Sequence, residues 1–136
     1  QAAVLLAKIK YVDQFNNKRM EIAKKYNNEL QGIEEIELPE ITSGSVFHQY
    51  TIRVKNNKRA ELQEFLKGKG IASMVYYPFC LHQMKLFKER AKIHRPLTEA
   101  EKASKEVISI PVEPLMTEQQ QNYVISTIRK FFLPNG

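Results

Sequence analysis

The fold is decided by the stretch Val46-Phe47-His48-Gln49-Tyr50-Thr51-Ile52-Arg53-Val54. Most of its residues are β-branched or aromatic, and residues of these kinds are enriched in strands. The even-numbered positions form a mostly apolar face and the odd-numbered positions form a more polar face, as in a strand that is buried on one side. The sequence therefore predicts a strand over residues 46–54.

A helix and a second strand are predicted directly after this strand. Asn56 or Asn57 suits the position that caps the start of a helix, and Gly68 and Gly70 suit its end. The apolar residues of this helix are Leu62, Phe65 and Leu66. Residues 71–77 predict a second strand, which ends at a proline.

The rest of the chain continues to alternate between helix and strand. Residues 83–90 predict a short basic helix, residues 107–112 predict a third strand, and capping-box sequences begin at Thr98 and Thr117. Strands separated by helices in this way predict a small sheet with helices packed on one face. The order of the elements leaves open whether the strands are parallel.

Apolar residues recur at helical spacing over the first 31 residues. The stripe is interrupted by Arg19 alone and consists of Ala2, Leu5, Ile9, Val12, Phe15, Arg19, Ile22, Tyr26 and Leu30. Gly32 suits the left-handed position after a helix. A helix of about 30 residues is about 45 Å long, and this one has no N-cap, so we expect it to begin upstream of Gln1. A coiled-coil dimer helix is the alternative, but it needs more heptads than residues 1–31 provide.

Length and composition limit the class of protein. The 136 residues suit one domain, and an apolar content of 43% is enough to bury a core. Cys80 is the sole cysteine, no Cys/His cluster has the spacing of a metal site, and no apolar run is long enough for a membrane span. We therefore expect a cytoplasmic domain with no metal and no membrane contact.

The net charge of +6 permits an anionic partner without identifying one. The basic residues of the chain are spread over helix faces and do not alternate with aromatic residues, so we do not expect nucleic-acid binding. No phosphate-binding or hydrolase motif is present. A thiol–imidazole pair of Cys80 and His82 is disfavoured because positions two apart seldom orient in that way.

One stretch carries chemistry that the rest of the chain lacks, Tyr76-Tyr77-Pro78-Phe79-Cys80-Leu81-His82. Two tyrosines and a histidine at a strand end provide aromatic faces and hydrogen-bonding groups. A structural interpretation, in which a tyrosine pair ends a strand at a proline turn, is favoured by the pattern alone. The functional interpretation is that these groups contact a sugar or phosphate ligand.

Several motifs in order along the chain resemble the DegT/DnrJ/EryC1/StrS family of sugar aminotransferases. They are Gln1–Ile9, Asn16–Arg19, Tyr26-Asn27, Val46–Arg53, Leu62–Ile71, Tyr76-Tyr77-Pro78 with Leu81-His82, Ala100–Ser104 with Ile110-Pro111, and Leu115–Gln120. The resemblance implies the small C-terminal domain of a fold-type-I aminotransferase. This would be an α+β domain with a mainly antiparallel sheet of about three strands, in which residues 1–136 form the domain and residues 1–31 form the long inter-domain helix.

The resemblance also implies a function for the intact protein. Such enzymes use pyridoxal 5'-phosphate to move an amine from glutamate to a keto group of a nucleotide-linked sugar, and we expect a homodimer that serves surface-polysaccharide or amino-sugar synthesis. The family's catalytic lysine and cofactor-binding residues belong to the large domain. We therefore expect no catalytic residue in this chain, no cofactor bound to the chain by itself and no activity from it.

The residues that carry over from the resemblance lie at the strand ends. Tyr76 and Tyr77, and then His82, are expected to bind the nucleotide sugar. His48 matches a recurrent family histidine, for which a buried, hydrogen-bonded structural role beside the site is expected. The basic residues between His82 and Pro96 depart from the family pattern. Two alternatives remain, a non-catalytic regulatory or sensory relative and a stand-alone binding module that dimerises through its long helix.

Overall fold

A three-stranded antiparallel sheet forms the centre of the computed structural model, which describes residues 1–90 and 92–134. Its strands are β1 (Ile36–Glu37), β2 (Tyr50–Val54) and β3 (Val107–Ile110), with β2 in the middle. Tyr50 pairs with Ile110 and Ile36 pairs with Val54, both in antiparallel register. The expectation of a small antiparallel sheet is confirmed.

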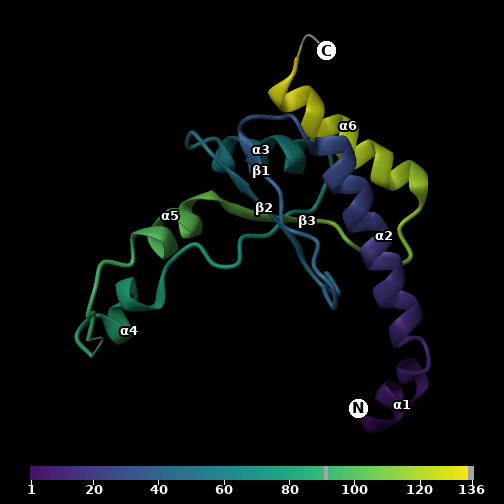
Figure 1. The fold of residues 1–136 in the computed structure, drawn as a ribbon, viewed down its shortest axis with the longest axis horizontal. Helices are drawn as coiled ribbons and strands as arrows, with labels where there is room; N and C mark the ends of the chain where they lie inside the picture. Colours follow the sequence, from purple (N-terminus) through teal and green to yellow (C-terminus); the bar gives the residue numbers. More distant parts are fainter. Residues whose placement is uncertain (91, 135–136) are drawn as a thin grey trace.

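Helices cover the apolar face of this sheet (Figure 1). They are α2 (Val12–Leu30), α3 (Arg59–Gly68) and α6 (Glu118–Phe132). The largest side chains that are completely buried come from these helices and from the even-numbered positions of β2, together with β3: Tyr26, Leu30, Tyr50, Ile52, Val54, Leu62, Leu66, Ile108 and Ile128. The alternation predicted for the strand therefore sets the face on which the core forms.

The central strand is shorter than predicted. Residues 46–49 are not part of it, because Phe47 adopts a left-handed backbone conformation with φ of 47°, which interrupts the extended run before Tyr50. β1 was not predicted at all, since its acidic stretch lacks the composition of a strand.

The predicted strand over residues 71–77 is wrong. This segment touches β3 at a single bridge, where Met74 N donates to Ser109 O at 3.0 Å and Ser109 N donates to Met74 O at 2.7 Å. Beyond the bridge the chain leaves the sheet, and the side chain of Met74 itself is exposed. Residues 71–77 are therefore held to β3 at one bridge and do not form a strand.

The single helix predicted over residues 1–31 is also wrong, because it is two helices. α1 (Ala2–Ile9) ends where Tyr11 N donates to Lys8 O at 2.9 Å, and α2 starts at Val12. No residue of α1 is buried, and the stripe becomes part of the core only from Ile22 onward. Most of the stability of a helix in a protein comes from the packing of its apolar face, and α1 has no buried residue to provide such packing. The left-handed Gly32 after α2, with φ of 85°, is confirmed.

The predicted helix caps divide into one that forms and two that do not. At Thr117 both reciprocal bonds of the capping box are present, Gln120 N to Thr117 Oγ1 and Thr117 N to Gln120 Oε1. Thr98 lies inside α5 (Thr98–Glu106) and makes no capping bond. Asn56 and Asn57 both take left-handed conformations in the turn before α3, whose cap position is Lys58.

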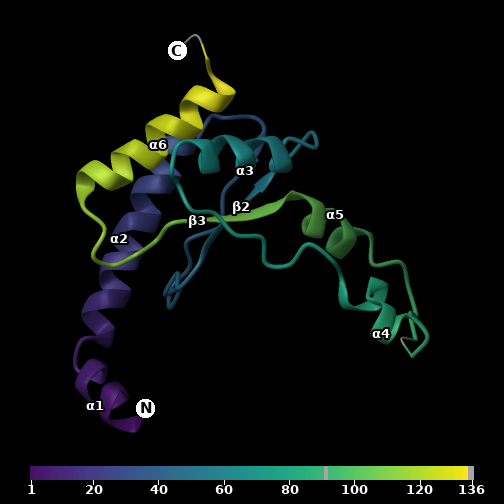
Figure 2. The same cartoon turned by 180° about the vertical axis from the view of Figure 1, so that it is seen from behind.

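Two parts of the chain extend from this packed body on either side of the sheet, as Figures 1 and 2 show from opposite directions. One is α1. The other, which we call the arm, comprises residues 78–90 and 92–97 and carries a 3₁₀ turn (Leu81–Gln83) and α4 (Lys85–Lys88). The short basic helix predicted over 83–90 is present in this shorter form. In the described residues, no helix is both long and apolar enough to cross a membrane.

Candidate substrate site

The predicted site residues lie where the chain leaves the sheet and enters the arm. The bridge between Met74 and Ser109 fixes the segment on one side, and α5 returns the chain to β3 on the other. Because β3 is held in the sheet through its full pairing with β2, the start of the Tyr76–His82 stretch has a rigid support. The far end of the stretch lies in the arm.

A first cavity, which we call the tyrosine–histidine hollow, has a volume of about 430 Å³. It is lined by Tyr76, Tyr77, Phe79, Cys80, Leu81, His82, Ala100, Ala103, Ser104 and Val107. The two tyrosine rings stand edge to face with their centroids 5.7 Å apart, and the peptide bond between them is cis. Tyr77 is 73% exposed and Tyr76 is 38% exposed, so both phenols are accessible to a ligand. The structure thus brings Tyr76, Tyr77 and His82 together in one cavity.

His82 has an internal partner that the sequence pattern did not reveal. Its Nε2 lies 2.8 Å from Oε1 of Glu101 on α5, and the imidazole is only 12% exposed. A carboxylate accepts hydrogen bonds, so Nε2 is the donor in this contact. Glu101 was expected in a capping box with Thr98, and its carboxylate instead orients the histidine.

A second cavity, which we call the arginine hollow, adjoins the first and shares Tyr76 with it. Its volume is about 310 Å³, and it is lined by Arg19, His48, Gln49, Ala72, Ser73, Met74, Tyr76, Ser109, Ile110, Pro111, Val112 and Glu113. His48 is exposed, so the buried structural role expected for it is wrong. The left-handed turn at Phe47 explains this, because His48 lies before the strand and not within it.

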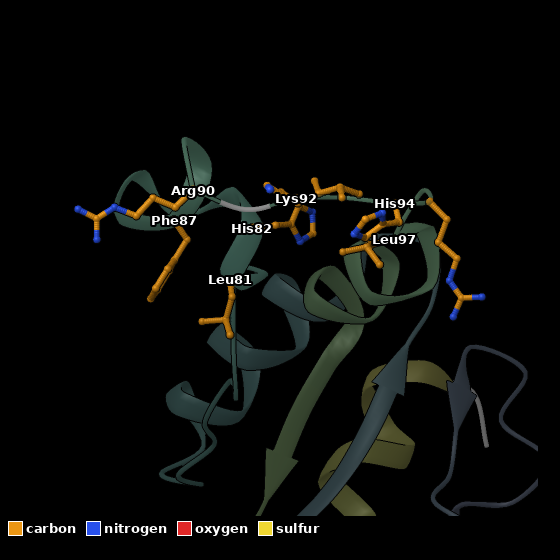
Figure 3. A pocket seen from close by; sticks show the side chains of 9 residues that line it. Leu81, His82, Phe87, Arg90, Lys92, His94 and Leu97 are labelled. Atoms are coloured by element: carbon orange, nitrogen blue, oxygen red, sulfur yellow. The ribbon is translucent and has the colours of Figure 1, made fainter.

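A third cavity, which we call the arm hollow, lies within the arm and has a volume of about 520 Å³. Its lining combines apolar residues with Arg90, Lys92, His94 and Arg95. Figure 3 shows that the side chain of Arg90 points away from Lys92, His82 and His94. The basic residues of the arm therefore do not converge on one point, and we assign no ligand to this cavity.

The described residues do not fit pyridoxal phosphate or a metal ion. Two cavities include a lysine. Lys92 lines the arm hollow, and Lys130 on α6 lines a further cavity together with Ser126, Arg129, Leu133 and Pro134; neither cavity has a carboxylate in its lining. The cofactor needs a lysine for its Schiff base together with a partner for its ring nitrogen. Within residues 1–90 and 92–134 no three metal-binding side chains lie close together.

Structural comparison identifies the class of fold. The chain superposes on a crystal structure of DesV from S. venezuelae, solved with a ketimine intermediate, with a TM-score of 0.90 and 30% identity. The match covers 98% of this chain and 36% of that one. The fold is therefore that of part of a fold-type-I aminotransferase.

Sequence comparison identifies the family. The model of the DegT/DnrJ/EryC1/StrS aminotransferase family matches residues 1–129, and the chain belongs to this family. A "pleiotropic regulatory protein" of Geobacillus stearothermophilus is 42% identical over 97% of the chain and 36% of its own length. A UDP-N-acetyl-3-dehydro-α-D-glucosamine 3-aminotransferase of Acidithiobacillus ferrooxidans is 36% identical over 96% of the chain and 34% of its own length. The chain thus spans about a third of the length of these relatives.

Proposed function

We propose that this chain is the C-terminal third of a pyridoxal-phosphate-dependent aminotransferase that moves an amino group from glutamate to a keto group of a nucleotide-linked sugar. The intact enzyme would be a homodimer, and its remaining two thirds would hold the cofactor. In this proposal the chain supplies binding and orientation of the sugar substrate rather than the reacting groups. The observation that carries the proposal is the tyrosine–histidine hollow in a chain whose family membership extends over nearly its whole length.

The side chains of the tyrosine–histidine hollow suit a nucleotide-linked sugar. The exposed ring of Tyr77 offers an apolar face to a base or a sugar ring, while its hydroxyl can both donate and accept a hydrogen bond. Tyr76 stands perpendicular to it, so the two rings form a corner. His82, which is hydrogen-bonded to Glu101, adds an imidazole to the lining of the same hollow. In the intact enzyme, the cofactor would be held by the remaining two thirds of the protein and would supply an electron sink.

A domain that only orients the substrate can still contribute substantially to the rate of the reaction. Holding a substrate in the reactive geometry can supply several kcal/mol of a reaction barrier, on the order of 7–11 in favourable cases. Tyr76 is supported by the bridge two residues earlier, at Met74, and the hydrogen bond to the carboxylate of Glu101 restrains the His82 ring. Both groups are therefore held in place before substrate arrives.

The proposal is tested with the intact protein. Incubation with pyridoxal phosphate, L-glutamate and a nucleotide-linked keto sugar should yield the corresponding amino sugar, detected by mass spectrometry, together with 2-oxoglutarate. Omission of L-glutamate is the matched control. An intact protein that binds the cofactor but aminates none of a panel of UDP- and dTDP-linked keto sugars would contradict the proposal.

A second candidate function has a specific observation in its favour. A relative with 42% identity carries the name of a regulatory protein, so a non-catalytic member of the family is a coherent alternative. Such a protein would bind a nucleotide sugar through the same hollow without transferring an amino group. Saturable binding of the sugar combined with the absence of a lysine that reacts with the cofactor would support this alternative.

A further inference from the structure

Arg19 is the one charged residue in the apolar stripe of the N-terminal residues 2–30. One turn further along α2, Ile22 is buried, and Tyr26 and Leu30 after it are completely buried. Arg19 lines the arginine hollow, and the residue is half-buried. The helix periodicity predicts an apolar side chain at this position. The arginine found there lines a hollow, and the other residues of that hollow indicate what its charge can bind.

The internal hydrogen bonds of Arg19 leave most of its donors unused. Its Nη1 donates to Asn16 Oδ1 at 3.2 Å, and among residues 1–90 and 92–134 no carboxylate lies within 4.0 Å of it. Arg53 on β2 provides the contrast, because its guanidinium is paired with Glu106 at 2.8 Å and with Glu37 at 3.6 Å. A guanidinium is a fixed fork of donors that matches a carboxylate in two parallel bonds.

The other polar groups of the arginine hollow determine which anion fits. His48 and Gln49, from the segment before β2, add donors beside Arg19, whereas Glu113, from the segment after β3, adds a negative charge. A ligand with several negative charges would meet Glu113 unfavourably. An α-amino acid carries a carboxylate for Arg19 and an ammonium group for Glu113, so its charges complement both.

We propose that the arginine hollow binds the amino acid that donates the amino group, with a carboxylate of this donor on Arg19 and its ammonium group toward Glu113. The inference rests on the proposed function and adds the binding site of the second substrate. Tyr76 lines both hollows, so the donor and the sugar would occupy neighbouring places on the same edge of the sheet. Two substrates that react in turn at one cofactor require such proximity.

The test measures equilibrium binding to the intact protein by calorimetry, with L-glutamate, glutarate and UDP as probes. Arg19→Gln should weaken L-glutamate and glutarate by about tenfold or more, since a charge-assisted hydrogen bond is lost, and should leave UDP within about twofold. Arg19→Lys should recover part of the affinity because it restores the charge without the fork. Glu113→Gln should weaken L-glutamate but not glutarate, which has no ammonium group.

Lys18→Gln is the matched control, because it removes the same charge one residue away, at an exposed position where Lys18 pairs with Glu21. An equal loss in Lys18→Gln and Arg19→Gln, a loss of UDP affinity in Arg19→Gln, or unchanged L-glutamate affinity would each overturn the inference. Should Arg19→Gln lower the melting temperature, His48→Gln serves as the second variant, with the same expected loss for both carboxylates. A protein that binds L-glutamate through Arg19 but aminates no keto sugar would contradict the proposed function while supporting this site.

Discussion

The packed body and the arm of this chain differ in what their apolar side chains touch. In the body, Ile52, Leu62 and Ile128 are completely buried between the sheet and its helices. In the arm, Phe79, Leu81 and Leu86 are each more than 60% exposed. The candidate site lies at the boundary, where Tyr76 is anchored to the sheet through Met74 and His82 is anchored to α5 through Glu101.

This difference separates stability from recognition along the chain. Side chains in the body set the free energy of unfolding because each of them loses a full shell of contacts when truncated. Side chains at the boundary contribute little burial and present their polar and aromatic atoms to a ligand. Substitutions in the two regions should therefore affect different measurements.

The largest effect is expected in the central strand. Ile52→Ala should lower the free energy of unfolding of the 136-residue chain by about 2–5 kcal/mol, since the side chain is completely buried. Leu6→Ala on α1, where Leu6 is 72% exposed, should change it by no more than about 0.5 kcal/mol. Urea denaturation measures both. Equal losses for the two variants would contradict the division into a packed body and an unpacked α1.

The second effect is a loss of stability in alkali. Burial raises the pKa of the Tyr26 and Tyr50 phenols well above the ordinary value of a tyrosine, and the neighbouring Tyr26 adds to this for Tyr50. The folded phenols therefore keep their protons while those of the unfolded chain ionise. Stability is fully present below about pH 10 and falls above it by about 1 kcal/mol per pH unit for each phenol.

Tyr50→Phe removes one of these titrating groups and the 2.6 Å hydrogen bond from its hydroxyl to Asn27 Oδ1. The variant should be less stable at neutral pH, and its stability should fall less steeply between pH 10 and pH 11. Denaturation midpoints measured across this range provide the comparison with the unsubstituted chain. Parallel curves for the two proteins would show that Tyr50 does not titrate in the manner described.

The sequence could predict the body better than the boundary, because the body depends on local patterns. The alternation of Tyr50, Ile52 and Val54 identified the buried face of β2, and the Thr117 capping box depends on residues three apart. The pairing of His82 with Glu101 joins residues 19 apart and follows from the tertiary fold. Segment 71–77 has the composition of a strand but pairs with β3 at one bridge. The number of residues that pair with a neighbouring strand depends on the tertiary fold, so no local pattern predicts it.

The third effect is on ligand affinity. Tyr77→Phe or His82→Ala in the intact protein should weaken a nucleotide-linked sugar by about tenfold, through the loss of one or two hydrogen bonds. Tyr123→Phe is the matched control, because Tyr123 on α6 lies outside the tyrosine–histidine hollow and its hydroxyl donates to Lys69 O. Calorimetric titration gives the dissociation constants. Unchanged affinity in both site variants would remove these residues from the substrate site.

The smallest effect separates the two threonine caps. Thr117→Ala should cost about 1 kcal/mol of unfolding free energy, because it removes the hydroxyl that accepts the hydrogen bond from Gln120 N at the start of α6. Thr98→Ala should cost no more than about 0.3 kcal/mol, since Thr98 makes no capping bond. Thermal or urea denaturation of the two variants side by side measures the difference. A cost at Thr98 equal to that at Thr117 would place α5 in a different hydrogen-bonded register.

The central claim is that the edge from Tyr76 to His82 binds the sugar substrate, and backbone hydrogen exchange of the intact protein tests it most directly. UDP-N-acetylglucosamine serves as a stable probe at saturating concentration. We predict slower exchange in the peptides that contain Tyr77 and His82, and unchanged exchange in α3, none of whose residues lines the tyrosine–histidine hollow. Protection confined to other parts of the protein, with residues 76–82 exchanging at the same rate with and without the probe, would contradict the claim.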